Sequence, residues 1–117
     1  MAKHNDTGKE GEELAATWLQ SNGFEIVKRN WRHFRYEIDI IASKKNCIHF
    51  IEVKTRKSKA YGFPEEQVSK SKLKQMVASG AEYLYQFGSW DSVRYDILAI
   101  NIREPESEFL FIEDVYC

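Results

Sequence analysis

The fold is decided by residues 36–55, which read YEIDIIASKKNCIHFIEVKT. Two apolar runs rich in β-branched residues, 36–42 and 48–55, flank a short polar segment, and this pattern predicts a β-hairpin. Each run carries charges in its middle, although a charge buried in a sheet is costly unless it is paired or binds a metal. Metal-assisted phosphodiester hydrolysis is the chemistry that best accounts for two acids and a lysine at such positions.

The spacing of the charges predicts that they meet on the hairpin. Side chains alternate along a strand, so Glu37 shares a face with Asp39, and Glu52 shares a face with Lys54. If residues 44–45 form a two-residue turn, Glu37 pairs with Glu52 and all four groups lie on one face. Asp39 and Glu52 are then diagonal neighbours, roughly 7–8 Å apart at the backbone. Both carboxylates can reach one cation from that distance.

Length and composition indicate one ordinary globular domain, residues 1–117. The chain is 43% hydrophobic and 30% charged, and it has no apolar stretch that approaches the ~20 residues of a membrane-spanning helix. Its start lacks an apolar signal core, and its two cysteines form no Cys-x-x-Cys pair. We therefore expect a cytoplasmic protein that does not contact the membrane.

The formal net charge is −1, but the basic residues are clustered. Segments 28–35 and 54–59 are rich in lysine and arginine and contain no acid. Such segments are suited to binding the phosphate backbone of a nucleic acid. For any one segment, the alternative that it is simply a solvent-exposed loop explains the charges equally well. Tyr61 and Phe63 could stack on a base, or simply pack their loop. The residues expected to contact nucleic acid are Arg32, Arg35, Thr55, Arg56, Lys57 and Lys72.

The order of elements predicts an α/β fold. A helix over 8–21, capped by Thr7 and Glu10 and stopped at Gly23, precedes a strand over 24–28 and the hairpin. A second helix over 69–87 then leads to strands over 93–100 and 109–115. The third strand, the second helix and the fourth strand would form a right-handed parallel crossover. The expected result is a mixed sheet with a helix on each face.

The first helix offers a further acid. Gly11 falls in the middle of its buried stripe, where a missing side chain permits close approach to the sheet. Glu12 falls beside that stripe and is placed to lean toward the hairpin carboxylates. Alternatively, Glu12 and Glu10 only complement the helix dipole.

These motifs together resemble the YraN family of small bacterial proteins. The resemblance spans residues 8–100 and rests on Gly8-x-x-Gly11-Glu12-x-x-Ala15, Arg29-Asn30-Trp31-Arg32, Glu37-Ile38-Asp39, Phe50-Ile51-Glu52-Val53-Lys54-Thr55-Arg56, Pro64-Glu65-Glu66-x-Val68 and Arg94-Tyr95-Asp96. That family is similar to archaeal Holliday-junction resolvases of the PD-(D/E)xK nuclease superfamily. Two positions depart from the pattern: Ile38 replaces the proline of the superfamily name, and Tyr36 replaces a usual glycine.

The resemblance implies a restriction-endonuclease-like αβββαβ core, here with an extra C-terminal strand. It also implies that Asp39 and Glu52 bind Mg²⁺ or Mn²⁺, that Lys54 is the motif lysine, and that Glu12 is the acid of the first helix. Glu37 is expected to lie next to these catalytic residues without binding the metal itself. The alternative is that Glu52 and Lys54 form a plain ion pair on an edge strand. We expect His49 to be structural and Asp96 to anchor an arginine or lysine.

Three functions follow as hypotheses. The first is a metal-dependent endonuclease acting on structured or branched DNA. The second is a nucleic-acid-binding module on the same fold with weak or no catalysis, and the third is a protein-interaction domain without nucleic acid. A resolvase cuts two strands symmetrically, so we expect a homodimer, with the apolar strand 109–115 at a sheet edge.

Overall fold

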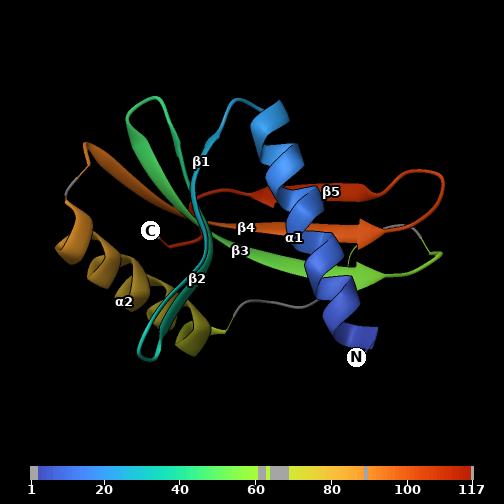
Figure 1. Cartoon of the computed structure of the whole chain (residues 1–117), viewed down its shortest axis with the longest axis horizontal. Helices are drawn as coiled ribbons and strands as arrows, with labels where there is room; N and C mark the ends of the chain where they lie inside the picture. The colour runs from blue at the N-terminus through green and yellow to red at the C-terminus, as the bar shows by residue number, and fades with distance from the viewer. Residues whose placement is uncertain (1–2, 61–62, 64–68, 89, 117) are drawn as a thin grey trace.

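The computed structural model describes residues 3–60, 63, 69–88 and 90–116. Within them the chain forms two helices and five strands: α1 (Lys3–Ser21), β1 (Glu25–His33), β2 (Tyr36–Lys44), β3 (Cys47–Lys57), α2 (Lys70–Phe87), β4 (Ser92–Ile102) and β5 (Glu108–Ile112) (Figure 1). This order confirms the expected α/β fold with its αβββαβ core and extra C-terminal strand. None of the described helices is both long and apolar enough to cross a membrane.

The five strands form one mixed sheet in the order β1-β2-β3-β4-β5. β3 and β4 are parallel and are joined through α2, whereas the other neighbours are antiparallel. β3 is therefore the central strand, and β1 and β5 are the edges. In Figure 1, α1 crosses in front of β3, β4 and β5, and α2 lies beside the curled β1–β2 hairpin.

Each helix covers its own apolar cluster, which confirms a helix on each face. Ala15 and Leu19 of α1 pack on one face of the sheet, with Ile40, Ala42, Ile51, Leu98 and Ile100. Tyr83 of α2 packs on the other face, with Trp31, Ile38, Ile41, Ile48 and Phe50. The sheet is thus apolar on both faces, as expected of a layer between two helices.

Gly11 lets α1 approach the sheet closely, as predicted. A Cβ atom added at Gly11 would lie 2.9 Å from the Cβ of Thr55. Gly80 plays the same part in α2, where an added Cβ would lie 2.8 Å from the Phe50 ring. Both helices therefore pack at distances that only glycine permits.

Several predicted boundaries were wrong. α1 begins at Lys3, so Thr7 lies inside the helix and forms no capping box; no Pro or Gly in 3–7 interrupts the helix. β1 continues to His33 because its polar second half pairs with β2, which an edge strand tolerates. β5 ends at Ile112, just before Asp114 takes a positive φ of 55°. Gly23, with φ 89°, follows the end of α1 as predicted.

The β2–β3 turn lies one residue later than predicted. Lys45 and Asn46 both have positive φ, 52° and 62°, the signature of a type I′ turn, and Lys44 pairs with Cys47. Asn tolerates this conformation, which favours a turn over 45–46 rather than 44–45. Each residue of β2 then lies opposite a β3 residue two positions later than predicted, so Asp39 lies toward Glu52 instead of Phe50.

Candidate metal and phosphate site

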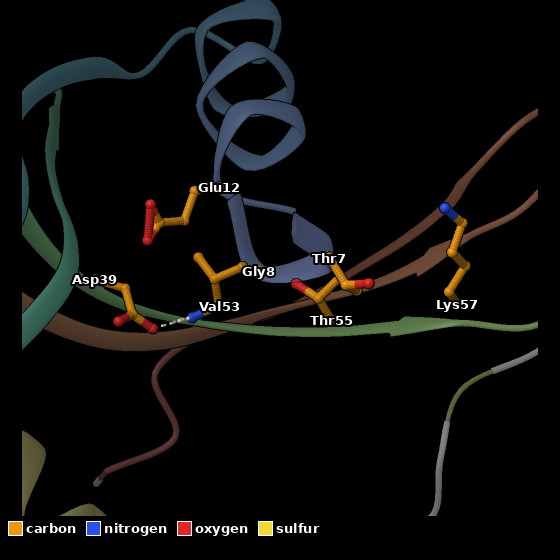
Figure 2. A pocket seen from close by; sticks show the side chains of 7 residues that line it. All are labelled: Thr7, Gly8, Glu12, Asp39, Val53, Thr55 and Lys57. Atoms are coloured by element: carbon orange, nitrogen blue, oxygen red, sulfur yellow. Dashed lines mark hydrogen bonds between the residues drawn. The ribbon is translucent and has the colours of Figure 1, made fainter. Parts of the chain in front are cut away.

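The site lies where β2 leaves β3. The two strands pair from Lys44 and Cys47 as far as Ile40 and Ile51, whereas β3 goes on pairing with β4 to its end. Asp39 is the first residue of β2 beyond the last pair. Its Oδ2 accepts a hydrogen bond from the backbone N of Val53 at 2.9 Å (Figure 2). The Asp39 carboxylate therefore occupies the slot that opens between the two strands.

The alternation of side chains breaks at Asp39. Ile38 packs under α2 and Ile40 packs under α1, although residues two apart on a regular strand share a face. Across the pair, Asn30 of β1 has a positive φ of 53°. This irregularity lets Asp39 reach both sides of the sheet. It lines a cavity of about 440 Å³ on the α1 side and a narrow one beside Glu52 on the α2 side.

The expectation that all four hairpin charges share one face holds only in part for Glu37, which lines the narrow cavity beside Glu52 but sits where alternation turns its side chain away. Tyr36 and Ile38, on either side of it, pack under α2, so Glu37 turns the other way. It is half exposed, and its Oε2 lies 3.8 Å from Nη1 of Arg32. The break at Asp39 is the reason, because it reverses the faces of the residues that precede it.

Glu52 lies on the α2 face with two lysines. Its Oε1 is 3.3 Å from Nζ of Lys72 and its Oε2 is 3.9 Å from Nζ of Lys54. The ion pair between Glu52 and Lys54 is present, but the alternative was wrong to place it on an edge strand, because β3 is the central strand and the Glu52 side chain is only 17% exposed. Lys72 was predicted only as a nucleic-acid contact, and its approach to Glu52 could not be read from the sequence.

Glu12 hangs from α1 above Asp39 (Figure 2). Its Oε1 accepts a hydrogen bond from Nδ2 of Asn30 at 2.9 Å. The helix dipole acts most strongly in the first turn of a helix. Because α1 begins at Lys3, Glu12 lies beyond that turn. The dipole alternative therefore does not explain it. Asn30 is the positioning residue that sequence reasoning missed, because the predicted strand ended at residue 28 and Asn30 was noted only as part of the Arg29-Asn30-Trp31-Arg32 motif. Asparagine tolerates the positive φ of 53° that Asn30 adopts.

Burial raises the pKa of Asp39 from 3.8 to about 6. The hydrogen bond from Val53 lowers this pKa, the charge of Glu52 raises it, Lys72 lowers it and Glu12 raises it. A carboxylate that is poorly hydrated and faces two other acids favours a proton or a cation beside it. The electrostatics of the slot therefore suit a positive ligand.

The donor set fits a hard divalent cation. Carboxylate oxygens are the ligands that Mg²⁺ and Mn²⁺ prefer, and Mg²⁺ needs only one or two of them because it keeps several waters. Among the residues that the structure describes, no group of three or more His, Cys, Asp or Glu side chains is arranged to hold a metal. An ion placed between Asp39 and Glu52 would thus not have Glu12 as a third direct ligand.

The predicted nucleic-acid contacts do not form one patch. Arg32 and Arg35 lie at the β1–β2 hairpin, where the Arg35 guanidinium stacks 4.8 Å from the centre of the Tyr36 ring. Thr55 lies under Gly11 on the α1 side, and Lys57 pairs with Glu10 at 3.7 Å. Alternation places Arg56 with Lys54 on the other face of the sheet, the face on which Lys72 contacts Glu52. Tyr61 and the motif over 64–68 lie outside the described residues.

His49 and Asp96 form a separate buried pair. Nδ1 of His49 and Oδ2 of Asp96 are hydrogen-bonded at 2.6 Å, and Oδ1 of Asp96 accepts from the backbone N of Asp114 at 2.8 Å. Asp96 was expected to anchor a lysine or arginine, and that was wrong. A buried carboxylate needs close partners, and here a histidine and a backbone amide supply them.

Comparison with known proteins identifies the family. The sequence profile of the uncharacterised protein family UPF0102 matches residues 11–100. The chain belongs to the UPF0102 (YraN) family. A UPF0102 protein of Phocaeicola vulgatus is 44% identical over 99% of this chain and 96% of its own length. Another, of Flavobacterium psychrophilum, is 38% identical over 99% and 98%. A third, of Rhodococcus jostii, is 39% identical over 99% and 100%.

The UPF0102 match contains the whole candidate site. Glu12, Asn30, Asp39, Glu52 and Lys72 all fall within residues 11–100, whereas β5 falls outside them. The resemblance to junction resolvases and to the wider nuclease superfamily remains a prediction.

Proposed function

We propose that this UPF0102 protein is a Mg²⁺- or Mn²⁺-dependent nuclease that hydrolyses phosphodiester bonds in structured or branched DNA. One observation carries the proposal. Asp39 and Glu52, from two adjacent strands, flank the slot where β2 leaves β3, and the Asp39 carboxylate is held there at a raised pKa. Such a paired, poorly hydrated carboxylate site has a clear use in binding a cation and little use in holding the fold together.

Each residue of the site has a proposed part. Asp39 and Glu52 bind the cation, and the Val53 amide fixes the orientation of Asp39. Lys54, one residue along from Val53 and 3.9 Å from Glu52, donates to the phosphate or orients the attacking water. Glu12, held by Asn30, accepts a hydrogen bond from a water in the α1-side cavity. A bound Mg²⁺ would act as a Lewis acid on a phosphate oxygen and would lower the pKa of a bound water.

The test is cleavage of a panel of labelled DNAs with Mg²⁺ or Mn²⁺: single-stranded, duplex, flapped and four-way-junction DNA. We expect cleavage that requires the metal and is lost in Asp39→Asn, Glu52→Gln and Lys54→Met. Glu13→Gln is the matched control, because Glu13 neighbours Glu12 on α1 but points to Arg29, 2.9 Å away. Cleavage that persists in all three site variants would refute the assignment.

One observation favours a second candidate, a DNA-binding module without catalysis. Lys72 lies 3.3 Å from Glu52 and neutralises it without a metal. In that case calorimetry detects no Mg²⁺ or Mn²⁺ binding at millimolar concentration, although the protein still binds DNA. Metal binding that is lost in Asp39→Asn and Glu52→Gln but kept in Glu13→Gln would exclude this candidate.

A further inference from the structure

The tip of the β1–β2 hairpin carries an aromatic side chain in an unusual setting. Phe34 and Arg35 form the two-residue turn between the paired residues His33 and Tyr36. Phe34 is 92% exposed, the most exposed of the large apolar side chains that the structure describes. Its backbone has a positive φ of 55°.

The fold gives no reason for a phenylalanine at this position. A side chain this exposed removes almost no apolar surface from water. A positive φ is unfavourable for a bulky residue, and Gly, Asn or Asp are the usual occupants. In the β2–β3 turn the two residues with positive φ are Lys45 and Asn46. Phe34 therefore contributes neither burial nor a relaxed turn, which points to a ligand.

The surroundings of Phe34 favour a polyanion with flat, stackable groups. Arg32 and Arg35 flank it in sequence, and the Arg35 guanidinium is held over the Tyr36 ring. The His33 ring contacts Phe34 edge-to-face with centroids 4.7 Å apart. His33 Nε2 lies 3.7 Å from the Glu82 carboxylate, which ties the base of the tip to α2 (Figure 1). Glu37 and Glu82 are the acids beside the tip, and each faces a basic side chain.

The tip is close to the candidate metal site. Phe34 precedes Asp39 by five residues on the same hairpin arm, a span of at most roughly 17 Å. Stacked base pairs rise by about 3.4 Å each, so this distance covers at most about five base pairs. One DNA molecule can therefore contact both Phe34 and Asp39.

We propose that Phe34 is a wedge that inserts into DNA at an unstacked step, such as a branch point, while Arg32 and Arg35 hold the flanking phosphates. This inference rests on the proposed function, and it names the feature of the DNA that the site selects. Apolar wedges between base steps and aromatic stacking on bases are established modes of binding DNA. Where the stack is already broken, the wedge does not bear the free-energy cost of unstacking, so branched DNA is preferred over continuous duplex.

The test compares binding of a four-way junction and of a continuous duplex of the same length by fluorescence anisotropy, in Ca²⁺ to prevent cleavage. We expect Phe34→Ala to bind the junction about 5- to 160-fold more weakly, the range typical for loss of one base–aromatic stack, while its affinity for duplex stays within about twofold. Phe34→Trp, which keeps an aromatic ring at this position, should keep the preference for the junction over the duplex. Tyr85→Ala is the matched control, because Tyr85 is an aromatic residue that is 86% exposed and lies on α2 rather than at the hairpin tip.

A second readout reports the stack directly. With 2-aminopurine at the branch point, wild-type protein should change the emission on binding, whereas Phe34→Ala should bind at saturation without that change. An equal junction affinity for Phe34→Ala and wild type, with DNA binding intact, would overturn the wedge and leave the proposed nuclease standing. Absence of DNA binding by the wild-type protein would overturn both.

Discussion

Replacing Asp39 by asparagine should stabilise the protein, and the size of the effect depends on pH. The pKa of Asp39 is about 6 in the folded chain against 3.8 ordinarily, a difference of about 2.2 (6 − 3.8). At 1.36 kcal/mol per pKa unit, ionised Asp39 costs the folded state up to about 3 kcal/mol. The asparagine side chain would still accept the hydrogen bond from Val53 through its Oδ1 atom. We therefore expect Asp39→Asn to raise the free energy of unfolding by about 1–3 kcal/mol near pH 8.

The sign follows from proton linkage. The folded state binds the Asp39 proton more tightly than the unfolded state, so this group lowers stability as pH rises from about 4 to about 6, and its effect is constant above that. Urea unfolding in EDTA at about pH 4, 5, 6, 7 and 8 should show a difference between variant and wild type that grows over that window. Glu13→Gln reports the general effect of removing one exposed negative charge. A difference that does not change with pH, or that falls as pH rises, would refute the account of Asp39 as a desolvated carboxylate.

Four further outcomes are expected. Gly11→Ala should lower the free energy of unfolding by about 1–3 kcal/mol, because the added Cβ atom would clash with the sheet. Gly8→Ala, which has open space around the added Cβ atom, should not, and thermal unfolding of the two variants tests the difference. Lys72→Met should tighten Mg²⁺ or Mn²⁺ binding in calorimetry, since this lysine competes with the cation; weaker binding would place it among the groups that help to hold the ion. Phe34→Gly should raise the free energy of unfolding by up to about 1 kcal/mol while weakening junction binding, because glycine relaxes the positive φ; a large loss of stability would show that the fold uses this side chain. Sedimentation should reveal a dimer through the β5 edge, at least on DNA; a monomer that binds a four-way junction one-to-one would contradict it.

The sequence by itself determined the kind of fold and most members of the site. Apolar runs with period 2, a helical stripe with period 3.6 and turn residues between them are local signals, so the elements and their order could be predicted. The glycine at position 11 and the acids at Glu12, Asp39 and Glu52 stood out for the same reason, because each is an exception to its own local pattern. The resemblance to YraN proteins rested on these residues, and comparison with known proteins confirms the family.

Tertiary structure decided the register, the faces and the electrostatics. The turn over 45–46 and the break in alternation at Asp39 and Asn30 depend on backbone angles that no side-chain period reports. The contact between Lys72 and Glu52 joins a helix to a strand 20 residues apart in sequence (72 − 52), and the raised pKa of Asp39 comes from burial between two strands. Local patterns report which residues prefer a strand or helix, whereas the free energy of a buried charge depends on every element packed around it. For that reason the sequence could name the carboxylates of the slot, and only the folded chain could show how they are held.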